Sequence, residues 1–120
     1  MTEASSNKDP VMWDHYYQKL KSFYVDQKVI GNLHYAVVET LADFTQDKQD
    51  AVTLYQEALA MSQPDEPRYM ILISMSEALA RLGRKEGAKV TALDGLRGAS
   101  ENEDYYYISE AERVLKELNE

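Results

Sequence analysis

The 120-residue chain contains no cysteine, only three prolines and five glycines, and just two phenylalanines and one tryptophan. Without cysteine there is no disulfide, no thiolate metal ligand and no thiol nucleophile. So few turn-forming residues argue against an all-β domain made of many short strands. The longest aliphatic run, at residues 70–73, is far below the roughly 20 residues that cross a bilayer.

Positive charge is also scarce, with 13 Lys and Arg against 21 Asp and Glu and a net charge of −8. Nucleic acids and anionic membranes require a basic surface, so we expect neither as a partner. The first ten residues lack the basic and then apolar order of a secretory signal. We therefore expect a cytoplasmic protein, with residues 1–8 as a disordered leader and residues 9–120 as one domain.

Apolar residues recur at helical spacing along the whole domain, and no segment shows the alternation of a strand. The pattern predicts an all-α protein of about six helices in antiparallel hairpins. We predict an N-terminal helix at 9–28, a first repeat at 30–63, a second repeat at 67–99, and a C-terminal capping helix at 100–119.

Local signals place the helix ends. Asp9 and Asp47 are predicted to cap the first and third helices. Pro10 would then be the first residue of the first helix. Two prolines at 64 and 67 separate the third helix from the fourth. Gly83 is expected to end the fourth helix in the left-handed conformation. Residues 100–103, Ser-Glu-Asn-Glu, have the spacing of a capping box that would open the sixth helix.

The chain repeats itself. Residues 38–42 match residues 76–80, and Ala51 and Ala58 of the third helix correspond to Ala88 and Gly95 of the fifth. A shorter echo of residues 75–78 occurs at residues 108–111. Small side chains at these positions allow helices to cross closely, and we interpret Ser76 and Ser109 as packing residues in the same way.

The repeated segments resemble the tetratricopeptide repeat family. Residues 82–88, Leu-Gly-Arg-Lys-Glu-Gly-Ala, resemble its hairpin turn, and residues 54–59, Leu-Tyr-Gln-Glu-Ala-Leu, resemble its second helix. The resemblance covers about residues 30–98 and departs at Gln46, where the turn glycine is missing, and at Val38, where a smaller residue is usual. It implies a right-handed stack of helix hairpins whose first helices line a concave groove that holds a peptide or helix.

Within that resemblance, the second, fourth and sixth helices would line the groove. Three glutamates fall at equivalent positions on them, and an apolar or aromatic residue precedes each by one helical turn. Such a surface favours a ligand with Lys or Arg beside apolar anchors. A solvated outer face is the alternative for the glutamates. The predicted partner-binding residues are Tyr35, Glu39, Met70, Ile73, Glu77, Tyr106 and Glu110.

The three consecutive tyrosines at residues 105–107 cannot all face one way on a helix. One or two of them must therefore be exposed or meet a partner.

No residues suggest catalysis, a metal site or a cofactor. His15 and His34 lie on different helices, without a carboxylate at the spacing of a zinc site. The acids at residues 43–50 lack the glycine and final glutamate of a calcium loop. No candidate nucleophile has a base beside it, so we expect a protein that is not an enzyme.

The expected function is therefore binding of another protein. Within the family, the small size resembles the chaperones of bacterial secretion systems, which implies protection of an export substrate before delivery. An immunity or inhibitor protein that blocks a basic effector with its acidic surface is an alternative. A homodimer formed through the N-terminal helix is a third, while the same helix could instead cap the array.

Overall fold

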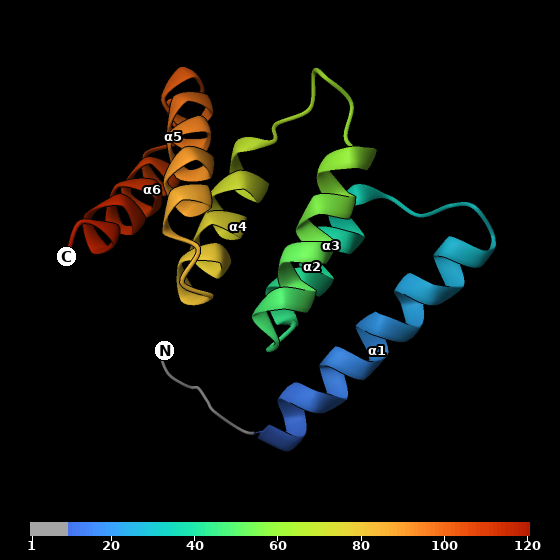
Figure 1. The fold of residues 1–120 in the computed structure, drawn as a ribbon. Coiled ribbons are helices and arrows are strands. Elements are labelled where there is room, and N and C mark those ends of the chain that lie inside the picture. The colour runs from blue at the N-terminus through green and yellow to red at the C-terminus, as the bar shows by residue number, and fades with distance from the viewer. Residues whose placement is uncertain (1–9) are drawn as a thin grey trace.

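The computed structural model describes residues 10–120, so the predicted leader at 1–8 and the predicted cap Asp9 lie outside the described residues. All regular structure in the described part is helical, which confirms the all-α prediction (Figure 1). The helices are α1 (Pro10–Val29), α2 (Tyr35–Phe44), α3 (Lys48–Met61), α4 (Tyr69–Arg81), α5 (Lys85–Glu101) and α6 (Tyr105–Leu118).

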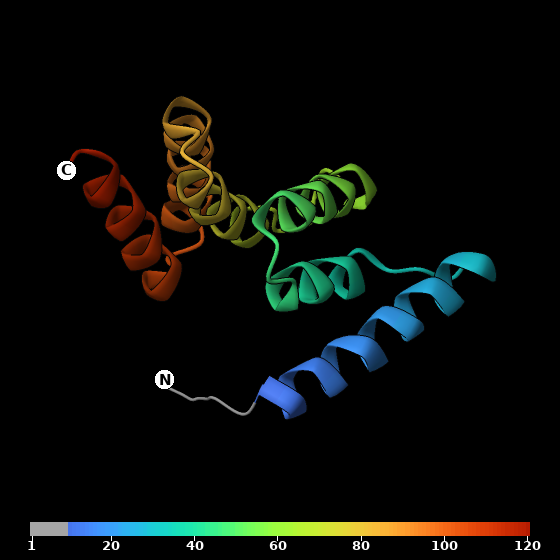
Figure 2. The ribbon, with the colours of Figure 1, turned by 60° about the horizontal axis from the view of Figure 1, so that its bottom comes forward.

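Each helix packs against its neighbour in the sequence, from α1 on α2 through to α5 on α6, and α4 also packs against α6. Figure 1 and Figure 2 show α4 in the middle of the array, between the α2–α3 hairpin and the pair formed by α5 and α6. The connections are short, so the order of helices in space follows the order in the chain.

Two of the predicted helix ends are confirmed. The carboxylate of Asp47 accepts a hydrogen bond of 2.9 Å from the Asp50 backbone N–H, as a helix N-cap does. Gly83 follows α4 with a φ of 79°, which an L side chain rarely adopts. The next N–H, that of Arg84, then reaches back to the Leu79 carbonyl at 3.0 Å.

The start of α2 was predicted too early. Residues 30–34 form the connector, and the helix begins at Tyr35 because His34 caps it. The Nδ1 atom of His34 accepts a hydrogen bond of 3.1 Å from the Ala36 N–H. Ile30 and Leu33, at the start of the predicted first repeat, therefore lie before the helix.

The predicted capping box at residues 100–103 is also wrong. α5 continues to Glu101, and the cap of α6 is Asp104, whose carboxylate accepts from the Tyr107 N–H at 3.2 Å. The extension has a packing reason, because Ala99 is fully buried and continues the buried stripe of α5 past Gly98. Tertiary burial thus outweighs the local capping signal.

The core consists of two clusters that meet at α4, which has seven buried residues. The first cluster joins the α2–α3 hairpin to α4 through residues such as Val38, Val52 and Ile71. The second joins α4 to α5 and α6 through Tyr69, Ile73, Ala99 and Ala111. Ile71 and Ile73 lie two residues apart and serve different clusters, so α4 connects both halves of the protein.

Small residues line the crossing of α4 and α5, as predicted. Ser76 and Ala88 have no exposed surface, and a Cβ atom on Gly95 would lie 2.4 Å from the Cγ1 atom of Ile73. A Cβ on Gly98 would lie 2.8 Å from the Cβ of Tyr69. Ser109 does not share this role, because it is exposed on α6.

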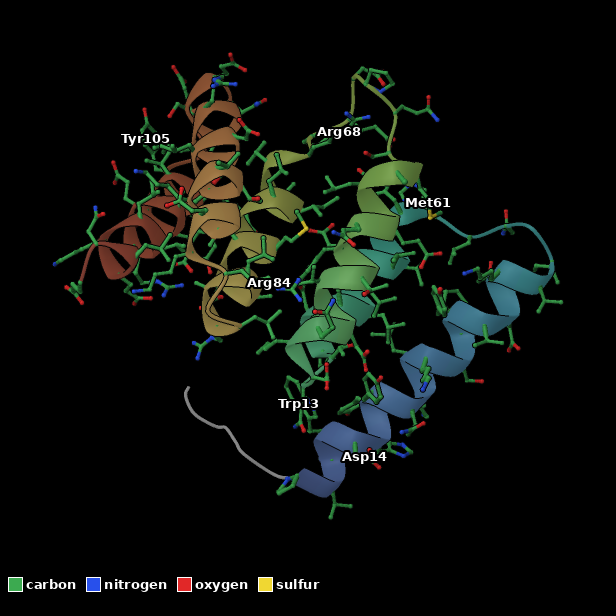
Figure 3. The ribbon with its side chains drawn as sticks, in the orientation of Figure 1. Trp13, Asp14, Met61, Arg68, Arg84 and Tyr105 are labelled. Carbon is green, nitrogen blue, oxygen red and sulfur yellow. The ribbon has the colours of Figure 1, made fainter. Side chains whose placement is uncertain are left out.

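α1 lies at the periphery and contains no buried residue. Its Trp13 ring packs on Phe44 with ring centroids 4.7 Å apart (Figure 3). Near its other end the Tyr24 hydroxyl donates to Glu57 at 2.8 Å, and Lys28 forms an ion pair with the same carboxylate at 3.1 Å. These contacts attach the helix to the α2–α3 hairpin by its two ends.

Candidate protein-binding cleft

A cleft of about 220 Å³ opens between α2, α4 and α6. Four of the seven predicted residues line it: Ile73 and Glu77 from α4, and Tyr106 and Glu110 from α6. The helices that contribute are the three that the sequence assigned to a groove. The remaining lining residues are Asp43, Ser74, Tyr107, Arg113 and Val114.

Two of the three predicted glutamates are not available as free carboxylates. Arg113 on α6 forms ion pairs with Glu110 at 2.9 Å and with Glu77 at 3.2 Å, and Glu117 pairs with the same guanidinium at 3.3 Å. Arg113 therefore bridges α4 and α6 across the cleft. The interpretation of Glu77 and Glu110 as part of an open acidic row is corrected accordingly.

The wall formed by α2 remains acidic. Glu39 and Asp43 lie one turn apart, and neither forms an ion pair within residues 10–120. Asp43 accepts a hydrogen bond from the Tyr55 hydroxyl. Burial, and then the nearby Asp43 charge, raise the pKa of Glu39 above its ordinary value. Negative charge in the cleft is thus concentrated on the α2 side.

The tyrosines at the start of α6 divide as expected. Tyr105 and Tyr106 are 75% and 67% exposed, whereas Tyr107 is half-buried and meets the Tyr69 ring edge-on at 5.9 Å. Burial, followed by the charges of Glu39 and Asp43, raises the pKa of Tyr107 to about 12. Tyr107 therefore lies close enough to the α2 carboxylates for their negative charge to oppose ionisation of its hydroxyl.

Three of the seven predicted residues do not line the cleft: Glu39, which lies one turn before Asp43 on α2, and Tyr35 and Met70, which lie elsewhere. Tyr35 stacks on His34 with ring centroids 4.6 Å apart and packs against the first core cluster. Burial, and then the nearby Glu66, raise the pKa of its hydroxyl. Met70 packs against the second cluster. Neither residue lines the cleft between α2, α4 and α6.

Five residues that line the cleft were not predicted from the sequence, among them Asp43, Tyr107 and Arg113. Helical spacing contains a signal for two of them: Asp43 follows Glu39 by four residues, and Arg113 follows Glu110 by three, so each pair shares a helix face. The position of Tyr107 depends on Asp104 as the true cap of α6.

Among residues 10–120, no three His, Asp or Glu side chains gather closely enough to hold a metal ion. None of the helices described is long and apolar enough to span a membrane. Searches of protein-family models, curated proteins and solved structures found no significant match.

The acidic wall predicts a pH-dependent stability. Glu39→Gln is expected to stabilise the protein modestly at neutral pH, because the raised pKa of Glu39 means that its ionised form opposes folding. The gain should be largest above the folded-state pKa and should shrink as the pH falls toward the unfolded-state value. Urea unfolding at pH 7 and pH 4 measures it.

The matched control is Glu112→Gln, which removes the same charge from an exposed position on α6. It should change the stability little at either pH. An equal gain from both variants would mean that net charge, and not burial of Glu39, causes the effect.

Proposed function

We propose that this protein is a non-enzymatic interaction module that binds a peptide or an amphipathic helix of another protein in the cleft between α2, α4 and α6. The observation that carries the proposal is the composition of the cleft. The exposed Tyr106 offers aromatic surface above the buried Ile73, while Asp43, one turn after Glu39 on α2, offers negative charge that no ion pair among residues 10–120 neutralises. Apolar anchors beside an acidic wall suit a ligand with Lys or Arg next to its apolar residues.

The helix arrangement supports a tetratricopeptide-like stack as part of this proposal. Equivalent positions of the two hairpins are buried alike. Val38 and Ser76 are both fully buried, and Ala51 and Ala88 are at most 2% exposed. In such a stack the first helix of each hairpin lines the inner face. α2, α4 and α6 would then be the inner helices.

A chaperone role fits the same chemistry. A partly helical client would bury its apolar face in the cleft, and the net charge of −8 would keep the complex soluble. In this proposal the client is a secreted or assembling protein, held by the module in the cytoplasm until it is delivered.

Tyr106 provides the most direct test. We expect Tyr106→Ala to weaken binding at least about tenfold, because a large aromatic side chain at a binding surface is a common energetic anchor. The probe is the strongest binder selected from a displayed library of amphipathic helical peptides that carry Lys or Arg, with the affinity measured by fluorescence anisotropy.

Tyr105→Ala is the control, because this neighbour is equally exposed but does not line the cleft. It should change the affinity less than about twofold, within the range of a near-neutral contact. Selection of no peptide, or equal losses from both variants, would contradict the proposal.

The acidic surface also allows the inhibitor function, in which charge dominates the binding of a basic effector. A salt titration of the affinity for the selected peptide distinguishes the two. Binding through apolar anchors should persist in high salt, whereas binding by surface charge should weaken steeply. In either case Asp43→Asn, which removes the charge, should lower the affinity for a basic ligand.

A further inference from the structure

α1 has two apolar stripes, and only one of them faces the rest of the chain. Trp13, Tyr17, Leu20 and Tyr24 lie on the side of the α2–α3 hairpin, where the last three are half-buried. The second stripe follows the alternating spacing of three and four residues that brings side chains onto one helix face. Its members on α1 are Tyr16, Lys19, Phe23 and Asp26, and Ile30 continues the spacing just beyond the end of the helix.

The second stripe is open to solvent. Tyr16, Phe23 and Ile30 are 54%, 49% and 68% exposed, which is unusual for three large apolar side chains on one face. Beside them lies a hollow of about 360 Å³, lined by Tyr16, Lys19, Leu20, Phe23 and Phe44. An apolar side chain from another molecule would fill this hollow.

The charge of α1 differs from that of the rest of the protein. Residues 10–29 contain three Lys and two Asp, whereas residues 30–120 contain 9 Lys and Arg against 17 Asp and Glu. Two copies that met through α2, which contains two acidic and no basic residues, would bring like charges together. Contact through α1 avoids that repulsion and leaves the acidic bodies apart.

The stripe itself contains one positive and one negative residue. Lys19 and Asp26 lie seven residues apart, and neither forms an ion pair within the part of the chain that the structure describes. In an antiparallel two-fold pair of α1 helices, centred between residues 22 and 23, Lys19 of each copy would lie opposite Asp26 of the other, and Phe23 would lie beside its own copy. A parallel pair would instead place Lys19 against Lys19 and Asp26 against Asp26.

We propose that this protein forms a homodimer through α1, in which the second stripe pairs with its own copy in the antiparallel direction. The pairing satisfies both charges, covers Tyr16 and Phe23, and fills the hollow next to Phe44. Such an interface is self-complementary, as a two-fold axis requires. The cleft between α2, α4 and α6 involves other helices and stays accessible in the dimer.

The first test uses the full chain in sedimentation velocity over a hundredfold range of concentration. A monomer–dimer equilibrium is expected, and Phe23→Lys should weaken it at least about tenfold, because a two-fold interface loses the contact twice. The control is Val25→Lys, an equally exposed residue on the opposite side of α1, which should leave the dimer constant within about twofold. A chain that stays monomeric, or equal effects of the two variants, would overturn the proposal.

The second test determines the direction of the pairing. Lys19→Asp alone should weaken the dimer, since it places like charges together, and the double variant Lys19→Asp/Asp26→Lys should restore it. In a parallel pair the double variant would behave as the wild type. A mixture of the Lys19→Asp variant with the wild type would instead form a tighter dimer, because the introduced aspartate would meet Lys19 of the wild-type chain. No rescue in the double variant, with helicity unchanged by circular dichroism, would overturn the antiparallel arrangement.

Discussion

Gly95→Ala is expected to destabilise the protein by about 1–3 kcal/mol, although the same change in an open helix stabilises by nearly 1 kcal/mol. The reason is the close crossing of α4 and α5. The new Cβ would lie 2.4 Å from the Cγ1 atom of Ile73 and 3.3 Å from its backbone nitrogen. The side chain cannot simply turn away, because Ile73 is almost fully buried, so the helices must separate.

Gly87→Ala is the control on the same helix. Its nearest neighbour would be the Cδ1 atom of Leu79 at 3.9 Å, an ordinary contact. This variant should be neutral or should gain up to about 1 kcal/mol from helix propensity. Urea unfolding of both variants gives the comparison, and similar stabilities would contradict the role of Gly95 in the crossing.

A double-mutant cycle identifies the atom that causes the clash. Ile73→Ala removes the side-chain atoms that the new Cβ would meet, so Gly95→Ala should cost less in that background. We expect a coupling free energy of about 1 kcal/mol or more between the two positions. Strictly additive effects would show that Ile73 is not the obstacle.

The sequence predicted those features of the fold that depend on nearby residues. The helical spacing of apolar side chains, the cap at Asp47 and the left-handed Gly83 were all confirmed, because each is decided within about one helical turn. Ser76, Ala88 and Gly95 were recognised as crossing residues because small side chains recur at equivalent places.

The sequence could not predict the features that arise between helices. Arg113 neutralises Glu77 only because α6 lies against α4, and the position of Tyr107 near Glu39 and Asp43 depends on the fold as a whole. Local capping signals also misled at residues 100–103, since α5 continues past the buried Ala99 to Glu101. The helices of the cleft were therefore predicted more successfully than its charges.

Ile71→Ala is expected to lower the stability by about 2–5 kcal/mol, the range for truncating a fully buried Ile. Ile71 has no exposed surface and lies in the core cluster that joins the α2–α3 hairpin to α4. Its loss should loosen that junction first. Leu93→Ala, at a position that is 44% exposed on α5, should cost much less and serves as the control.

Hydrogen exchange followed by mass spectrometry would show where the protein opens. In a stack whose units contact mainly their neighbours, a substitution at one junction should destabilise most the units that meet there. Ile71→Ala should therefore speed exchange in α2 and α3, whereas Ile73→Ala, in the other cluster, should speed it in α6. If both variants raise exchange equally in every helix, α2 to α6 unfold as one unit, and the proposed stack of separable hairpins is wrong.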